Sequence, residues 1–368
     1  MSASTTAMKG EDPLVIRFMM LPDDLILNCL ARVSRLYYPI LSLVSKRFRI
    51  LIASTELYHI RVLLGCIESG LYVCLRSSTH GANPLRWFTL CHRPGRAEKV
   101  LVPILSPNSP TDFRTKVAAV GPYIYAFGGL INYNASSSVM VMDCRSNTWS
   151  EAPSMGMARM APSACVLDEK IYVVGGCAKL NSTNWIEVFD TNTQTWEFLQ
   201  IPSEKICLGS IYKSVGYEGT IHVRSEELGV TCKLYKGRWR EADLMMNKAW
   251  GLPSTYCVIA NVFYRCGGCK IYWYDSKERI WKTLKGLEGL SSFYRNGDVK
   301  LAEYGEKMAV LWEEFVHVEN YRENIIWCAE IALERHINWG IRGTVEWFGK
   351  VFTSKEPYRL VHAFASTL

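Results

Sequence analysis

The chain has 368 residues, of which 49% are hydrophobic and 21% are charged, and this balance excludes a largely disordered protein. Its net charge of +7 is moderate and gives no reason by itself to expect nucleic acid as a partner. No apolar stretch reaches the roughly 18 residues of a membrane span and no signal-peptide pattern is evident, so we expect no membrane partner and a cytoplasmic and/or nuclear location.

The first part of the chain is expected to be helical. Residues 1–14 are small, polar and unpatterned, and we expect them to be disordered. Residues 15–61 are expected to form about three helices: the first begins near Pro22, the second runs from Pro39 through Ile52, and Ser54 or Thr55 caps the third. A unit of about 40 residues cannot form an adequate core alone, so we expect its apolar face to pack against the rest of the chain or against a partner.

Residues 62–112 carry a weaker, strand-like signal. Gly70–Leu75 and Leu85–Leu90 look like two strands, and the proline-containing stretch from Pro94 to Pro110 looks like a connection. We interpret this region as a first, degenerate unit of the larger domain that follows, together with its connection.

A repeat dominates residues 113–354. Three times, an alternating apolar run ends in a Gly-Gly pair, a second apolar run ends in Asp, and a Trp follows. The Gly-Gly pairs begin 47 and then 92 residues apart, so a copy without the glycines is expected midway. The motif residues are Gly128, Gly129, Trp149, Gly175, Gly176, Trp196, Gly267, Gly268 and Trp281.

A period in the forties with strand-like content indicates a β-propeller, in which each blade has four short strands. We expect the glycines to allow backbone torsions that a Cβ would block, and the aromatic residues to pack between blades. The expected fold is therefore mostly β, with about six blades behind a small three-helix domain. The repeats are placed near 121–166, 168–216, 217–253, 254–298 and 299–350, and residues 355–368 either add a closing strand or fray.

Two parts of the chain resemble known modules. The opening Leu-Pro-Asp-Asp-Leu of residues 21–61, their central Leu-x-x-Val-Ser-Lys-x-Phe and their closing Ser-x-Glu-Leu-Tyr-x-x-Arg resemble an F-box, although the Trp found late in many F-boxes is absent. The double-glycine, Tyr and Trp arrangement resembles the kelch repeat. Together they resemble the F-box/kelch-repeat family, which is especially common in plants.

That resemblance implies a substrate receptor of an SCF (Skp1–cullin–F-box) ubiquitin ligase. The F-box would bind the acidic adaptor Skp1, and through it the cullin, while the propeller would bind an unknown target protein. Basic side chains in the second helix would speed the encounter with an acidic partner. The residues that the resemblance assigns to adaptor binding are Leu21, Pro22, Leu25, Ile26, Leu30, Leu41, Val44, Lys46, Arg47, Phe48 and Leu51.

No residue of the propeller can be assigned to target binding from the sequence. The long connections Leu130–Ser138 and Ala178–Trp185 are candidates, as is Arg159, because loops carry binding in such folds. Ordinary polar turns explain each of them at least as well.

No catalytic, metal-binding or cofactor-binding set is evident. Cys266 and Cys269 form a Cys-x-x-Cys, but a zinc site needs a second pair of ligands. Asp143, Asp190 and Asp275 recur at one position of the repeat, which favours a role in turns. We therefore expect a non-catalytic protein without metal or cofactor. Two alternatives stay open: a kelch-propeller enzyme, and an interaction scaffold whose F-box acts without the cullin.

Overall fold

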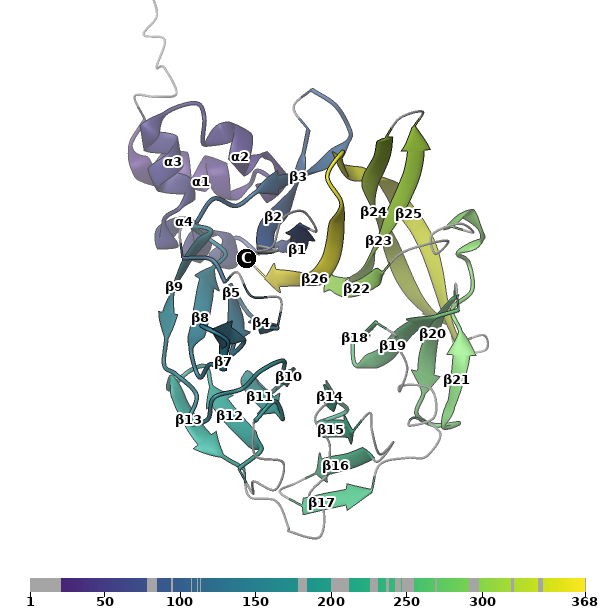
Figure 1. The fold of residues 1–368 in the computed structure, drawn as a ribbon. Coiled ribbons are helices and arrows are strands. Elements are labelled where there is room, and N and C mark those ends of the chain that lie inside the picture. Colours follow the sequence, from purple (N-terminus) through teal and green to yellow (C-terminus); the bar gives the residue numbers. More distant parts are fainter. Residues whose placement is uncertain are drawn as a thin grey trace, which may run out of the picture.

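The computed structural model combines a helical domain with a ring of β-sheets (Figure 1). It describes residues 21–77, 85–93, 95–106, 108–110, 112, 114–177, 184–199, 212–225, 231–235, 238–241, 246, 255–268, 270–290, 298–318, 321–336 and 340–367. The disordered terminus expected for residues 1–14 therefore lies outside the described residues.

The helical domain has more breaks than the sequence pattern suggests. Its elements are α1 (Asp23–Ala31), the 3-10 turn η2 (Arg35–Tyr37), α2 (Tyr38–Leu41), α3 (Lys46–Ile52) and α4 (Thr55–Leu63). The prediction of one continuous helix from Pro39 to Ile52 is wrong. Ser45 has an extended backbone, and its Oγ accepts a hydrogen bond from the Phe48 backbone N at 3.1 Å, so Ser45 caps a new helix. Ser54 caps α4 in the same way, at 3.2 Å from the Leu57 backbone N.

The helices share a core of their own. A buried arginine closes this core: Arg61, only 2% exposed, donates to the carbonyl oxygens of Ala31 and Val33 and to the hydroxyl of Tyr38 at 2.9–3.0 Å. These bonds satisfy carbonyl groups where α1 ends. The helices therefore bury part of their apolar surface against one another, while Tyr58 of α4 packs against the propeller core, as expected for a unit that packs against the rest of the chain. The buried members are Ile26, Leu27, Leu30, Ala31, Tyr38, Phe48, Leu51 and Leu57.

Among the described residues, six antiparallel sheets have four strands each, which confirms a mostly β propeller. The strands of each sheet are given from the centre of the ring outward. The first sheet has β26 (Tyr358–Thr367), β1 (Ser69–Ser77), β2 (Leu85–His92) and β3 (Lys99–Pro103), and the second has β4 (Lys116–Val120), β5 (Tyr123–Phe127), β8 (Val139–Asp143) and β9 (Thr148–Ala152). The third has β10 (Ser163–Leu167), β11 (Lys170–Val174), β12 (Ile186–Asp190) and β13 (Thr195–Phe198), and the fourth has β14 (Tyr212–Tyr217), β15 (Thr220–Ser225), β16 (Thr231–Tyr235) and β17 (Arg238–Glu241). The fifth has β18 (Tyr256–Ile259), β19 (Val262–Gly267), β20 (Lys270–Asp275) and β21 (Ile280–Thr283), and the sixth has β22 (Val299–Tyr304), β23 (Lys307–Val318), β24 (Tyr321–His336) and β25 (Gly340–Ser354). Smaller elements are β6 (Leu130–Ile131), β7 (Asn134–Ala135) and the 3-10 turn η4 (Glu288–Leu290).

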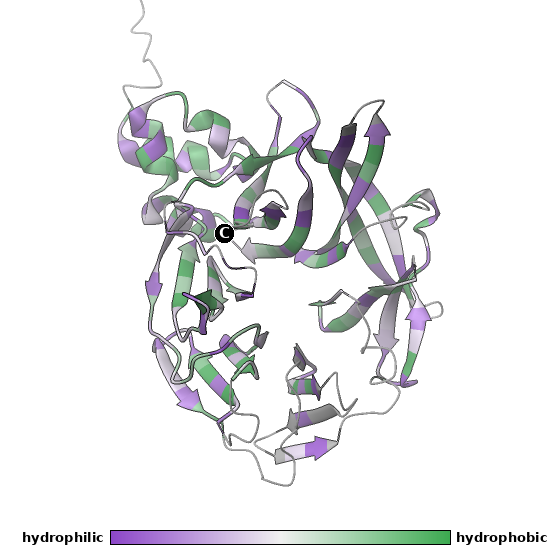
Figure 2. Ribbon diagram, viewed as in Figure 1, coloured by the Kyte–Doolittle hydropathy of each residue, from purple (hydrophilic) through white to green (hydrophobic). Residues whose placement is uncertain are grey.

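The inner strands of the six sheets surround the centre of the ring (Figure 1). Burial falls outward within a blade: β11 and β12 are mostly buried, whereas β13 is mostly exposed, and Figure 2 shows the same change from hydrophobic to hydrophilic residues. Side chains between neighbouring sheets form the core, as where Trp87 of β2 packs against Trp149 of β9 with ring centroids 5.3 Å apart.

The two ends of the propeller meet in one sheet. Strand β26 pairs with β1 along its length, from Ser69 opposite Thr367 to Ser77 opposite Tyr358, so the segment 355–368 supplies a closing strand. This pairing closes the ring, because the last strand of the chain completes the sheet that begins with the first strand. The expected connection Pro94–Pro110 contains a strand instead, because β3 pairs with β2 as the outer strand of this first sheet.

The strand ends explain the recurring motif residues. The backbone N two residues after each of Asp143, Asp190 and Asp275 donates to that aspartate's Oδ1 at 2.9–3.1 Å, which confirms the role expected in turns. Five of the six motif glycines have positive φ, whereas Gly267 keeps the extended backbone of β19.

Gly128 is a motif glycine whose surroundings leave no room for a side chain. Its φ is +65°, and a Cβ there would lie 2.4 Å from the carbonyl oxygen of Arg159. Gly128→Ala is therefore expected to lower the free energy of unfolding by about 3 kcal/mol, measured by urea denaturation. Gly121→Ala is the matched control: Gly121 has φ +54° but no atom within 4 Å of its added Cβ, so only the torsional cost of about 1–2 kcal/mol remains. Equal losses in the two variants would show that the close approach to Arg159 is unimportant.

Candidate functional site: an exposed helical patch and the propeller channel

The residues expected to bind an adaptor divide into two groups in the structure. Ile26, Leu30, Phe48 and Leu51 are 0–7% exposed and lie in the core of the helical domain. A direct contact by these four side chains is corrected to a supporting role, because they hold the helices together and offer no free surface. Leu21 and Leu41 are half-buried against the same core.

Several large apolar side chains of the helical domain are exposed, and besides Leu63 at the end of α4 they include four on α1, on α3 and in the turn before α3. Leu25 of α1 is 49% exposed, Leu43 and Val44 in the turn before α3 are 76% and 58% exposed, and Ile50 of α3 is 69% exposed. We call these four residues the helical patch.

The sequence reading missed Leu43 and Ile50. A continuous helix from Pro39 to Ile52 would place Leu41, Val44, Phe48 and Leu51 on one face. This regular spacing predicts a single helix, although the structure has a break at Ser45. A Ser three positions before an apolar residue is an N-cap signal that could have revealed the break. The break separates Val44, which faces solvent, from Phe48, which is buried.

The basic side chains next to the patch have different roles. Lys46 is exposed and lies two positions after Val44 and four positions before Ile50 in the sequence. Arg47 instead holds the start of α1 in place: it donates to Asp23 Oδ1 and to the Leu21 carbonyl oxygen, each at 2.7 Å. Of these two cations, Lys46 is the one left to meet an acidic partner.

Glu68 fixes the helical domain to the propeller. Its Oε2 accepts a hydrogen bond from the Arg35 backbone N at 2.7 Å and lies 3.2 Å from Arg61 Nη2. The Arg35 side chain also donates to the carbonyl oxygen of Cys144, after β8, at 3.0 Å. Tyr37 stacks on His92 of β2 with ring centroids 5.0 Å apart. These contacts join the helical domain to the first two blades, and none of them involves a residue of the helical patch.

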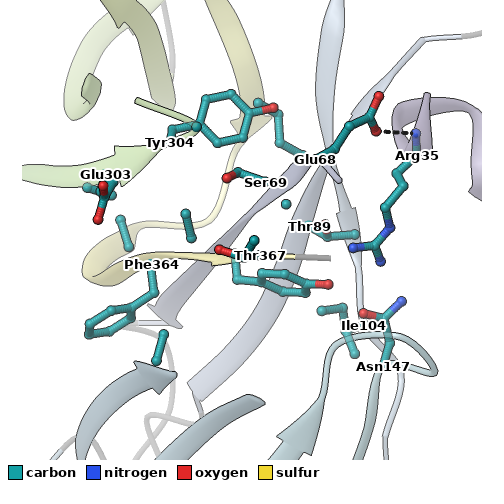
Figure 3. Close-up of a pocket in the computed structure, with 18 of the residues that line it drawn as sticks. Arg35, Glu68, Ser69, Thr89, Ile104, Asn147, Glu303, Tyr304, Phe364 and Thr367 are labelled. Carbon is teal, nitrogen blue, oxygen red and sulfur yellow. Dashed lines mark hydrogen bonds between the residues drawn. The ribbon is translucent and has the colours of Figure 1, made fainter. Parts of the chain in front are cut away.

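A cavity of about 1360 Å³ lies between the helical domain and the near mouth of the propeller channel. Arg35 and Glu68 line its helical side, and Glu303, Phe364 and Thr367 line its channel side (Figure 3). Burial raises the pKa of Glu303. Because both signs of charge line this cavity, its walls favour no particular class of charged ligand.

Comparisons with known proteins agree with these two modules. An F-box domain model matches residues 18–60, and a model described as FKB95, Kelch-repeats domain, matches residues 87–352. F-box/kelch-repeat protein At4g33900 of Arabidopsis thaliana is 54% identical over 98% of this chain and 99% of its own length. The chain belongs to the F-box/kelch-repeat family. The putatively named Arabidopsis F-box/kelch-repeat proteins At3g43710 and At4g39290 are 54% and 52% identical over 95% and 97% of this chain and 93% and 99% of their own lengths.

In this F-box/kelch-repeat protein, the candidate target-binding residues differ in how exposed they are. Arg159 is fully buried and binds Glu187, so a direct contact with a target is corrected to a structural role. The connection Leu130–Ser138 carries the β6–β7 hairpin, whose Tyr133 is 96% exposed and Ile131 56% exposed. Of the connection Ala178–Trp185, only Asn184 and Trp185 are described, and Trp185 is buried.

The F-box/kelch-repeat chain shows no metal centre in its described part, where no three His, Cys, Asp or Glu residues are grouped as ligands. Cys269 of the Cys-x-x-Cys lies outside the described residues, so that pair is not tested. None of the described helices has the length and apolar character needed to cross a membrane.

Proposed function

We propose that this F-box/kelch-repeat protein is the substrate-recognition subunit of an SCF ubiquitin ligase. Its helical domain binds a Skp1-like adaptor, and through it a cullin, while its propeller binds the target protein. The protein itself carries no catalytic group in this proposal, and it acts where the ubiquitin system operates, in the cytoplasm and/or nucleus. Family membership and the two-module architecture support it.

The helical patch is the observation that carries the proposal. The helical domain has its own core and is joined to the propeller through Glu68, yet Leu43, Val44 and Ile50 remain more than half exposed. Fully burying each of these side chains against an adaptor would contribute about 1.5–3 kcal/mol. Lys46 beside the patch adds a charge that would speed association with an acidic partner.

The mechanism is tethering. An adaptor on the helical patch and a target on the propeller are held by one chain, whose two modules are joined by the Arg35 and Arg61 contacts to Glu68. Tethering raises the effective concentration of a target lysine near the ubiquitin-carrying enzyme and replaces a bimolecular encounter with an intramolecular one.

Reconstitution tests the proposal. The purified protein, mixed with a Skp1-like adaptor, is expected to form a 1:1 complex on a sizing column and then to recruit a cullin. Recovery of the adaptor without the cullin would support the scaffold alternative. Failure of the folded protein to bind any Skp1-like adaptor of its own source would contradict the proposal.

A further inference from the structure

Three lysines from three different blades lie at one level of the propeller channel. Lys116 of β4, Lys213 of β14 and Lys300 of β22 each stand four residues before the last residue of an innermost strand. Their pairing is equivalent: each strand ends at a tight turn, where Val120 faces Tyr123 in the first blade of the three. The propeller repeat therefore places the three lysines at equivalent positions around the channel, where the charges of Lys300 and Lys213 act on Lys116, although the first and last lysine are 184 positions apart in the sequence.

The other three blades place neutral polar groups at the same level. Ser163 and Thr255 stand four residues before the ends of β10 and β18. His362 of β26 precedes Ser366 by four, and Ser366 Oγ donates to the carbonyl oxygen of Gly121 in the turn after β4. We call Lys116, Lys213, Lys300 and His362, with Ser163 and Thr255, the channel ring.

The ring lies on the far side of the channel from the helical domain. The residues that follow its members on the inner strands, including Val117, Leu301 and Ala363, line the cavity that opens toward the helical domain. Each ring member lies one residue earlier on its inner strand than these cavity-lining positions. The ring is therefore separate from the helical patch and from the contacts of Glu68.

Among the described residues, the positive charges of Lys116 and Lys300 are only partly compensated. Lys116 has no ion pair within the described chain, and no carboxylate there acts on its charge. Burial lowers the pKa of Lys300, and the negative charges of Asp298 and Glu313 offset part of that effect. Burial, followed by the charge of Lys300, lowers the pKa of Lys116 to about 8; Cys165 acts in the opposite direction, and the charge of Lys213 adds to the lowering.

Polar groups in the ring remain available to a ligand. Nε2 of His362 is buried and has no hydrogen-bond partner among the described residues. Burial and the charges of Lys116 and Lys300 lower the pKa of His362 to about 3, so the imidazole is neutral and adds no further repulsion. Thr255 Oγ1 accepts a hydrogen bond from the Leu301 backbone N at 3.2 Å, which leaves its own hydroxyl proton to donate.

We propose that the channel ring binds a small anion carrying several phosphate oxygens. Lysine ammonium groups act as point charges and suit an anion whose oxygens point in several directions, as phosphate groups do. The site is independent of adaptor binding and goes beyond the proposed function of the helical patch. It gives the propeller a small-molecule ligand at the channel end opposite the helical domain.

Calorimetry with inorganic pyrophosphate tests the site. The full-length protein at pH 7 and low salt is expected to bind one pyrophosphate, and Lys116→Met and Lys300→Met are each expected to weaken binding at least tenfold. Lys270→Met is the matched control, because Lys270 is exposed on β20 away from the channel, and it should leave binding unchanged. At pH 8 binding should take up protons, because the anion raises the pKa of Lys116.

Each outcome decides the proposal. Absence of pyrophosphate binding to the folded protein would overturn the proposal. So would binding by Lys116→Met and Lys300→Met that is as tight as binding by the unchanged protein. Equal weakening by Lys270→Met would show diffuse attraction to a basic protein and would also overturn it. If Lys116→Met does not fold, Lys300→Met gives the result. Adaptor capture by the same variants should stay unchanged, which separates this site from the proposed function.

Discussion

Replacing Val44 and Ile50 together with aspartate is expected to weaken binding of a Skp1-like adaptor by at least about 100-fold. Both side chains are mostly exposed, at 58% and 69%, so neither change removes a contact from the helical core. In the proposed complex each is buried, and an aspartate there loses the apolar contact and is left without a partner. Two losses of about 1.5–3 kcal/mol each amount to this factor or more. Calorimetry with purified adaptor measures it.

The control for this variant is Ile131→Asp. Ile131 is 56% exposed on the β6–β7 hairpin of the propeller, so the same chemical change there should leave adaptor affinity unaltered. Phe48→Asp would not serve, because Phe48 is 5% exposed in the helical core and its loss would unfold the domain that is being tested. Unchanged affinity of a folded Val44→Asp, Ile50→Asp protein would remove the helical patch from the adaptor interface.

Arg159→Met is expected to lower the free energy of unfolding by about 3–5 kcal/mol. The guanidinium is 0% exposed and donates to the carbonyl oxygens of Gly175, Trp185 and Asn184 at 2.7–3.0 Å. Its Nη2 lies 2.8 Å from Glu187 Oε1, and Glu187 is itself 1% exposed. Removing the arginine leaves a buried carboxylate without its counter-charge and takes one donor away from each of three carbonyl groups. Urea denaturation measures the loss.

Two further variants separate charge from packing at this site. Adding Glu187→Gln to Arg159→Met should recover part of the stability, because it removes the uncompensated charge but keeps a hydrogen-bonding side chain. Arg93→Met breaks an exposed pair, in which Arg93 and Glu98 have side chains 53% and 56% exposed, and should cost less than about 1 kcal/mol. Similar losses in Arg93→Met and Arg159→Met would contradict the importance of burial.

Local patterns in the sequence were enough to predict the type of fold. The Gly-Gly, Asp and Trp punctuation recurs because each blade needs the same turns and the same inter-blade packing, and its period led to the propeller directly. The F-box motif likewise located the helical domain. The last sheet was inferred from apolar runs alone, although its strands β23 to β25 are 12 to 16 residues long.

The candidate sites needed the tertiary structure. Helical spacing cannot distinguish Phe48 in the core from Val44 at the surface when a capping serine breaks the helix between them. In the sequence, Arg159 looks like an ordinary cation in a loop. In the structure, it is enclosed by β11 and β12 and bound to Glu187.

The chain by itself determined the repeating unit and the helical module, because turns, caps and apolar periodicity act between residues close in sequence. Only the closed ring of blades decided which side chains from distant parts of the chain lie at the same level of the channel. Lys116 and Lys300 come together because six blades set their innermost strands at one level around the channel, and no local pattern encodes that distance.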